Sequence, residues 1–201
     1  MSAMMAAASW RKVARFTAIY GPGRTLFKVA GRLRLGLLLQ TLRRPTLDIG
    51  VIGCGQFALA TIGYFLRRHG GRIAACYDID ATARASFARV LGVKLQARTV
   101  EALLAREGLG AVYIASNHAS HTPYALQSLE RGIDTYIEKP VAVDLAQLAA
   151  LVAAARRSKA RVFAGYNRPF AAAIRTLREE MSIDRGKGLT LQCFVSGHAI
   201  A

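Results

Sequence analysis

The chain divides into two parts by the pattern of its apolar and polar positions. From Leu47 onward, short apolar segments alternate with longer segments in which apolar residues recur at helical spacing. Short, nearly continuous apolar segments are typical of parallel strands that are covered on both faces. We therefore predict an α/β fold: a doubly wound parallel sheet of the Rossmann type, with helices between its strands.

The elements of this sheet can be placed along the chain. The expected strands span residues 47–53, 73–77, 111–115, 134–138 and 161–164. The expected helices span residues 57–69, 80–91, 99–106, 121–131 and 144–157, with Asp80 and Thr99 at N-cap positions. Ligands of such sheets bind beyond the carboxyl ends of the strands. We therefore expect the site in the segments that follow the strands: residues 53–58, 78, 116–121, 138–140 and 165–168.

The first expected strand leads directly into a G-x-G-x-x-A motif at residues 53–58. Gly53 permits a tight turn from strand to helix, and Gly55 lets a pyrophosphate approach the backbone N–H groups. Ala58 lets the helix pack close to the strand, and the helix N-terminus favours phosphate. The motif predicts a dinucleotide site that includes Gly53, Gly55, Gln56, Phe57 and Ala58. The alternative is a glycine-rich turn in another kind of α/β protein.

An acidic residue, Asp78, follows the second expected strand, twenty positions after Ala58. A carboxylate at this distance is placed to accept hydrogen bonds from the ribose hydroxyls of a dinucleotide. Asp78 and Asp80 would also repel a 2′-phosphate, so we expect NAD rather than NADP. Arg84, one helical turn beyond Asp80, could accommodate a 2′-phosphate. The alternative interpretation of Asp78 is a helix-capping residue.

Composition excludes several classes of protein. Of the 201 residues, 53% are hydrophobic and 20% are charged, which suits a chain with a packed core rather than a disordered one. The uncharged apolar segments near the N-terminus, residues 35–42 among them, are too short to span a bilayer. Three scattered cysteines favour neither a disulfide framework nor a zinc site. We expect a cytoplasmic protein that binds no metal.

Positive charge is concentrated in the first quarter of the chain. The net charge is +16, and nine basic residues but no acidic residue precede Asp48. Between Thr25 and Leu42, apolar and basic residues recur at spacings typical of a basic amphipathic helix. Such an arm can pack on the domain, lie on an anionic membrane surface, serve as an organellar transit peptide or contact nucleic acid. The arm lacks any basic-aromatic motif of a nucleic-acid module, so we do not expect nucleic acid as its partner.

Three segments near the expected site carry a resemblance to a known family. They are Ala115-Ser-Asn-His-Ala-Ser-His121, Glu138-Lys-Pro140 and Gly165-Tyr-Asn-Arg-Pro-Phe170. Together with the glycine motif, these segments resemble the Gfo/Idh/MocA oxidoreductases. The segment Val51–Ala58 is similar to members of that family associated with bacterial surface-polysaccharide synthesis. The resemblance covers roughly residues 47–170.

The resemblance implies roles for individual residues. Lys139 would lie near the nicotinamide and the substrate carbinol, where an ammonium stabilises an alkoxide or transfers a proton. Pro140 would rigidify the turn, Glu138 would orient Lys139 or contact the ribose, and His121 would lie near the nicotinamide. The alternatives are a solvated loop lysine at position 139 and a histidine bonded to backbone at position 121. Ser116 and Asn117 would contact the cofactor. Asn167 and Arg168 would border the substrate pocket, and we also include Asn167 among the cofactor-binding residues.

The expected organisation has three parts. Residues 1–46 form a basic extension, residues 47–170 a dinucleotide-binding Rossmann domain, and residues 171–201 the beginning of a truncated α+β substrate domain. Family members normally carry a complete second domain, and here only one of its strands, Gly188–Ser196, is expected. An unpaired strand favours association, so a second copy or a completing partner chain is expected.

Three functional hypotheses follow. The first is an NAD(P)-dependent oxidoreductase that transfers a hydride between nicotinamide and a carbinol of a small sugar, polyol or nucleotide-sugar-like substrate. The second is a non-catalytic dinucleotide-binding module or fragment. The third is a basic surface-binding protein that acts through residues 1–46.

Overall fold

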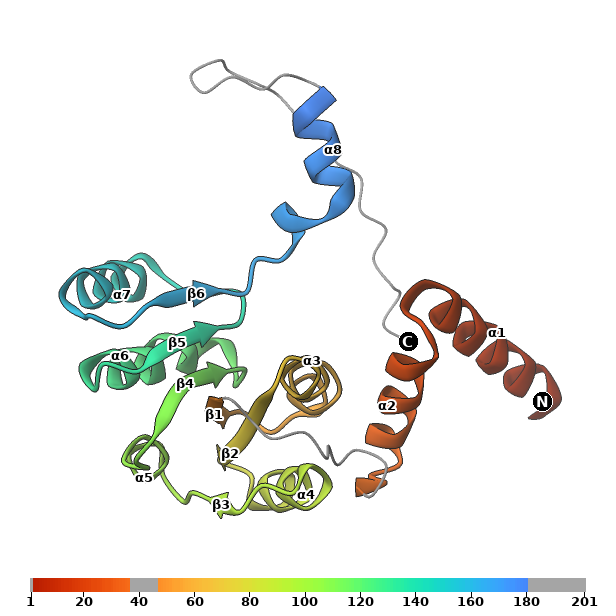
Figure 1. Ribbon diagram of the computed structural model, residues 1–201, viewed down its shortest axis with the longest axis horizontal. Helices are drawn as coiled ribbons and strands as arrows, with labels where there is room; N and C mark the ends of the chain where they lie inside the picture. Colours follow the sequence, from red (N-terminus) through yellow and green to blue (C-terminus); the bar gives the residue numbers. More distant parts are fainter. Residues whose placement is uncertain (1, 37–46, 181–201) are drawn as a thin grey trace. The chain divides into compact units, whose positions relative to one another are not determined.

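A computed structural model describes residues 2–36 and 47–180, which form parts of two compact units, residues 1–165 and 166–201. The first unit contains a six-stranded parallel sheet (Figure 1). Its strands are β1 (Leu47–Ile52), β2 (Gly71–Tyr77), β3 (Leu95–Gln96), β4 (Leu109–Ile114), β5 (Asp134–Ile137) and β6 (Val162–Ala164). The strand order β3-β2-β1-β4-β5-β6 is that of a doubly wound sheet, so the predicted fold class is confirmed. The short strand β3 was not predicted.

Helices cover both faces of this sheet. They are η2 (Ala58–Ile62), α3 (Gly63–Arg68), α4 (Ala81–Leu91), α5 (Val100–Leu104), η3 (His118–Ser120), α6 (His121–Glu130) and α7 (Leu145–Arg157). The N-cap predictions are confirmed, because Asp80 accepts hydrogen bonds from Thr82 and Ala83 and Thr99 accepts one from Ala102. The helix after the glycine motif contains a π-helical turn, η2, which the periodicity did not predict.

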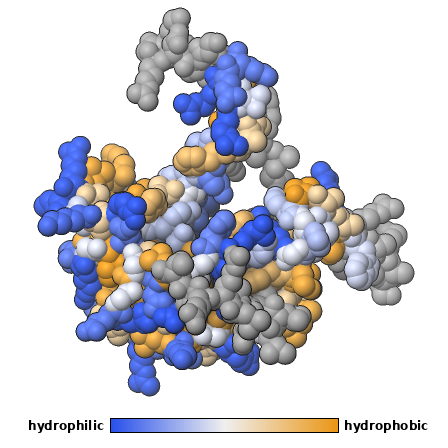
Figure 2. Space-filling view, viewed as in Figure 1, coloured by the Kyte–Doolittle hydropathy of each residue, from blue (hydrophilic) through white to orange (hydrophobic). Residues whose placement is uncertain are grey.

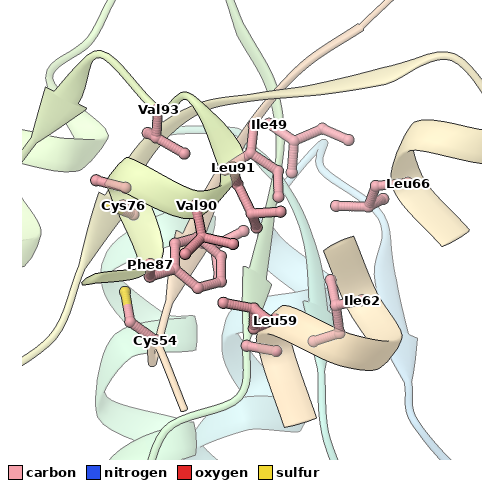
Figure 3. Close-up of a cluster of buried hydrophobic side chains, with 14 of the residues drawn as sticks. Ile49, Cys54, Leu59, Ile62, Leu66, Cys76, Phe87, Val90, Leu91 and Val93 are labelled. Atoms are coloured by element: carbon pink, nitrogen blue, oxygen red, sulfur yellow. The ribbon is translucent and has the colours of Figure 1, made fainter. Parts of the chain in front are cut away.

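Two hydrophobic clusters lie on opposite faces of the sheet because successive strand residues point in opposite directions. One cluster packs β1 and β2 against η2, α3 and α4, and Figure 3 shows the ring of Phe87 among Leu59, Val90 and Leu91. The other packs β4 and β5 against α5, α6 and α7. Cys54 and Cys76 are free, buried thiols in the first cluster.

The N-terminal arm forms two helices, α1 (Ser2–Tyr20) and α2 (Pro22–Arg32), rather than one helix over residues 25–42. Gly21, with φ of 83°, separates the helices, and Pro22 begins α2 because its fixed φ suits the first turn. Arg34 has a left-handed φ of 56°, which is incompatible with a continuing helix. Residues 37–42 of the predicted helix lie outside the described residues.

Helix α2 packs on the α/β fold. Ala30 and Gly31 are buried, and a Cβ on Gly31 would lie 2.7 Å from the Leu59 side chain in η2. The rings of Phe27 and Tyr64 make an edge-to-face contact. The interpretation of the arm as a domain-packing extension is therefore correct for this helix. No helix within residues 2–36 and 47–180 has both the length and the apolar character to cross a membrane.

The second unit is described only up to residue 180. It contains η4 (Arg168–Phe170) and α8 (Ala172–Glu180). The predicted boundary between the Rossmann and second domains, after residue 170, lies five residues beyond the boundary between the two compact units. The strand expected at Gly188–Ser196 lies outside the described residues.

Candidate dinucleotide site

The turn after β1 requires glycine at its first position. Gly53 has a φ of 96°, and its N–H donates to the Tyr77 carbonyl at 2.8 Å. A Cβ on Gly53 would lie 2.5 Å from the carbonyl carbon of Ala115, at the end of β4. The turn after β1 therefore lies close to the loop after β4. The strand order reverses between these two strands, and doubly wound folds bind ligands at that position.

The second glycine of the motif has open space where a side chain would be. No atom lies within 4 Å of a Cβ built on Gly55, and Gly55, Gln56 and Phe57 are exposed. Ala58, in contrast, is fully buried in the first hydrophobic cluster. The backbone at Gly55 can therefore be approached by a ligand, while Ala58 brings the helix close to the sheet.

Asp78 connects the loop after β1 with the loop after β2. Its carboxylate accepts hydrogen bonds from the N–H groups of Cys54 at 2.6 Å and Asp80 at 2.9 Å. The Arg84 guanidinium donates to the Asp78 carbonyl at 2.7 Å. The helix cap of α4 is Asp80, so the capping interpretation of Asp78 is wrong. Each carboxylate oxygen retains a lone pair with which to accept a ribose hydroxyl.

Ser116 and Asn117 shape the loop after β4. The Asn117 side chain accepts a hydrogen bond from the Ser120 N–H at 3.1 Å and thereby caps η3. The hydroxyls of Ser116 and Ser120 lie 2.8 Å apart. The loop is ordered by its own side chains, and Asn117 remains exposed.

His121 connects the loops that follow β4 and β5. Its side chain is buried, with Nδ1 2.8 Å from the Pro140 carbonyl oxygen and Nε2 3.1 Å from the Ser116 carbonyl oxygen. Thr122, which the sequence reasoning missed, donates from its hydroxyl to the Val141 carbonyl at 2.8 Å. The histidine thus has the backbone-bonded arrangement, and both ring nitrogens face the protein.

Glu138, Lys139 and Pro140 follow β5, with a cis peptide bond between Lys139 and Pro140. The Glu138 carboxylate accepts a hydrogen bond from the Lys139 backbone N–H at 3.3 Å. Lys139 is exposed, and its ammonium makes no ion pair or hydrogen bond with the residues that the structure describes. Glu138 therefore supports the turn, while the Lys139 ammonium remains accessible.

Two tyrosines near Glu138, Tyr113 and Tyr136, were not found by sequence reasoning. The Tyr136 hydroxyl lies 3.4 Å from Glu138 Oε1, and its ring stacks on Tyr113 with centroids 4.6 Å apart. Burial, followed by the charge of Glu138, raises the pKa of Tyr136 to about 12. A Cβ on Gly165 would lie 3.1 Å from the Glu138 Cα. The only sequence signal for Tyr136 is its position directly before the Glu-Lys-Pro motif.

Asn167 and Arg168 belong to the second compact unit. Asn167 is exposed, and its carbonyl accepts a hydrogen bond from the Phe170 N–H at 3.1 Å. Arg168 begins η4.

The other predicted residues form one continuous edge. Asp78 holds the Gly53 turn, that turn contacts the Ala115–Ser116 loop, and His121 bonds this loop to Pro140. A parallel sheet with this strand order, a glycine turn and a carboxylate after β2 defines a dinucleotide-binding Rossmann domain. The open space at Gly55 and the free lone pairs of Asp78 fit the pyrophosphate and ribose of NAD.

Comparison with known proteins identifies the family. Residues 47–166 match the Gfo/Idh/MocA family model, described as an oxidoreductase family with an NAD-binding Rossmann fold. The chain belongs to this family, and its NAD-binding Rossmann domain is therefore established.

Relatives include several sugar and polyol dehydrogenases. The chain is 33% identical to an inositol 2-dehydrogenase from Ralstonia nicotianae, over 74% of this chain and 45% of the relative. It is 30% identical to a glucose-6-phosphate 3-dehydrogenase from Bacillus subtilis, over 59% of this chain and 33% of the relative. The structure of a myo-inositol dehydrogenase from Lactobacillus casei, in complex with NAD(H) and myo-inositol, matches with a TM-score of 0.58 and 25% identity. That match covers 69% of this chain and 41% of the other. The chain thus spans less than half the length of these relatives.

Proposed function

We propose that this chain provides the NAD-binding part of an oxidoreductase that transfers a hydride between nicotinamide and a carbinol carbon of a sugar, polyol or nucleotide-sugar-like substrate. The observation that carries the proposal is the continuous edge formed by the loops after β1, β2, β4 and β5. Relatives named as inositol and sugar-phosphate dehydrogenases support this substrate class.

The residues along this edge have different roles in the proposed reaction. Gly53 and Gly55 leave the backbone N–H groups open to the pyrophosphate, and Asp78 accepts hydrogen bonds from the ribose. Bound NAD supplies the acceptor for the hydride that leaves the carbinol carbon. The accessible Lys139 ammonium stabilises the negative charge that develops on the carbinol oxygen. In the direction of carbonyl reduction it donates the proton that the new hydroxyl requires, and in the reverse direction the neutral amine accepts that proton.

Cofactor binding is tested first. Gly55→Val places a side chain in the open space at the turn, so NADH affinity should fall about tenfold or more, a difference of about 1.4 kcal/mol. Gly23→Val is the matched control. A Cβ built on Gly23, like one on Gly55, meets open space, but Gly23 belongs to α2 and not to the site. Isothermal titration with NADH and NADPH measures both variants. Equal NADH affinity in wild type and Gly55→Val would contradict the site.

Catalysis is tested separately. Lys139→Met should lower turnover of a polyol or sugar substrate by about 10²- to 10⁴-fold while NADH affinity changes little. Lys159→Met is the control, since Lys159 is exposed at the amino end of β6, away from the loops of the site. A Lys139→Met variant that loses NADH binding as well would indicate a structural lysine. Wild-type NADH binding without turnover on any such substrate would favour the non-catalytic module.

A further inference from the structure

Helix α2 presents two different faces. Phe27, Ala30 and Gly31 face η2 and α3, where Ala30 and Gly31 are buried and Phe27 contacts Tyr64. Leu26, Val29 and Leu33 occur at spacings of three and four residues and therefore share another face. Their exposed fractions are 58%, 38% and 63%. The packing on the α/β fold thus fixes α2 and leaves a continuous apolar stripe, Leu26–Val29–Leu33, in contact with solvent.

Helix α1 carries further exposed aromatic and basic groups and contacts α2. Trp10, the single tryptophan of the chain, is 73% exposed, and Ile19 and Tyr20 are exposed near the end of α1. The Thr17 and Thr25 hydroxyls lie 3.1 Å apart, and the Lys28 ammonium lies 4.0 Å from the Phe16 ring centroid. These contacts join α1 to α2 as one helical pair.

The helical pair contains basic residues but no acidic residue. Arg24 stacks on the rings of Tyr20 and Phe65, and no ion pair within residues 2–36 and 47–180 involves a basic residue of α1 or α2. Burial, followed by the nearby charges of Arg32 and Arg24, holds the pKa of Lys28 below its usual range. An anionic surface placed against the pair would relieve this repulsion.

We propose that α1 and α2 form a docking surface for an anionic lipid membrane. The pair combines exposed leucine and tryptophan side chains with basic groups that form no ion pair among the described residues. An interfacial helix requires both, because its apolar face enters the acyl boundary and its cations meet the lipid phosphates. A nucleic-acid duplex would satisfy the charges but leave the Leu26–Val29–Leu33 stripe in water. The family match begins at residue 47, so this surface is additional to the NAD-binding domain and independent of its proposed reaction.

The first test is co-sedimentation of the full chain with vesicles of phosphatidylcholine alone or of phosphatidylcholine with phosphatidylglycerol. We expect binding to the anionic vesicles only, weakened by salt. The double variant Leu26→Ser/Leu33→Ser should bind about tenfold more weakly, because two apolar side chains no longer enter the lipid. The control Arg156→Gln/Arg157→Gln removes two exposed charges from the end of α7 and should bind like the wild type.

A second readout requires no variant. Emission of Trp10 should shift to the blue on addition of anionic vesicles and remain unchanged with phosphatidylcholine, since the indole moves from water into the interface. NADH titration of every variant checks that the Rossmann domain is intact and separates a failure of this proposal from a failure of the proposed function. Absence of vesicle binding, binding without a blue shift, or equal losses in the leucine and α7 variants would overturn the proposal. So would a DNA duplex that binds as tightly as the anionic vesicles and is unaffected by the leucine substitutions.

Discussion

His121 shows how a single residue can join two parts of the site. Its ring lies between the carbonyl oxygens of Ser116 and Pro140, which belong to the loops after β4 and β5. Because the ring is buried, its removal leaves the carbonyl group that accepts its N–H hydrogen bond without this donor and shielded from water. We therefore propose a positioning role for His121, in which its ring holds the two loops together.

This role predicts a defined loss of stability. His121→Leu should lower the free energy of unfolding by about 1–3 kcal/mol, the usual cost of buried unsatisfied polar groups. His118→Leu is the matched control, because His118 is three residues away and exposed. Urea unfolding followed by circular dichroism measures both variants. Equal midpoints for His121→Leu and wild type would show that the two loops do not depend on this contact.

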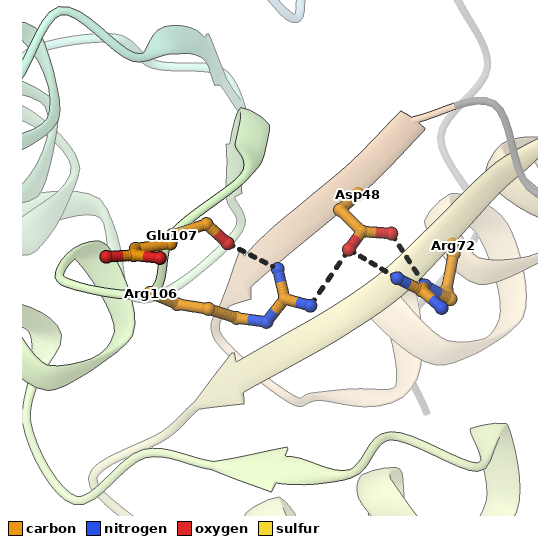
Figure 4. Close-up of polar contacts among 4 residues, drawn as sticks. All are labelled: Asp48, Arg72, Arg106 and Glu107. Carbon is orange, nitrogen blue, oxygen red and sulfur yellow. Dashed lines mark hydrogen bonds and ion pairs between the residues drawn. The ribbon is translucent and has the colours of Figure 1, made fainter.

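At the scale of the elements, the amino end of the sheet is held by an ionic cluster. Asp48 of β1 accepts hydrogen bonds from Arg72 of β2 at 2.6 Å and from Arg106, just before β4, at 2.8 Å (Figure 4). The hydrogen bond from Arg72, followed by that from Arg106, holds the pKa of Asp48 below its usual range. The three central strands are thereby connected at the edge opposite the site.

The lowered pKa predicts how stability changes with pH. A carboxyl whose pKa is lower in the folded state stabilises the protein above its unfolded pKa, and this contribution is lost as pH falls through the folded value. Asp48→Asn should thus be about 0.5–1 kcal/mol less stable than wild type near pH 7. The difference should shrink as the pH falls through the lowered pKa of Asp48 in the folded state. Glu107→Gln is the control, since Glu107 makes no ion pair among the described residues. A difference that persists in acid would exclude the ionic explanation.

Periodicity located most elements but not all of their ends. The expected helix from Thr25 did not include Pro22 and continued too far, because the apolar spacing of residues 33–38 resembles that of α2. Backbone dihedral angles such as the left-handed φ of Arg34 depend on the surrounding structure and cannot be derived from apolar spacing. The π-helical turn η2 escapes prediction for the same reason.

At the scale of the whole molecule, helices α1 and α2 of the N-terminal arm belong to the same compact unit as the sheet. Ala30 belongs to the same hydrophobic cluster as Leu59 and Ile62 of the glycine-motif helix. In Figure 2, hydrophilic and hydrophobic residues are interspersed over the face in view. An arm that contributes to the core can also affect the stability of the NAD-binding domain.

Removal of the arm tests this contribution. A chain that lacks residues 1–46 should be less stable by about 2 kcal/mol or more, because apolar side chains of η2 and α3 become exposed. A chain that lacks only residues 1–20 retains α2 and should lose less stability, since α1 packs on α2. Urea midpoints of the three chains give the comparison. Identical loss in both truncations would show that the contact of α2 with η2 contributes nothing.

The sequence by itself determined the parallel α/β fold, the glycine turn, Asp78 and the family motif around Lys139. These features depend on local properties: apolar spacing, the conformational range of glycine, and short motifs at strand ends. Tertiary structure alone decided the partners of His121, the Asp48–Arg72–Arg106 cluster and the exposed stripe of α2. Each of these depends on which distant segments meet, as when Arg106 reaches Asp48 across 58 positions of the chain. Tertiary packing, rather than the local sequence pattern, determines which face of an element is buried and which remains exposed.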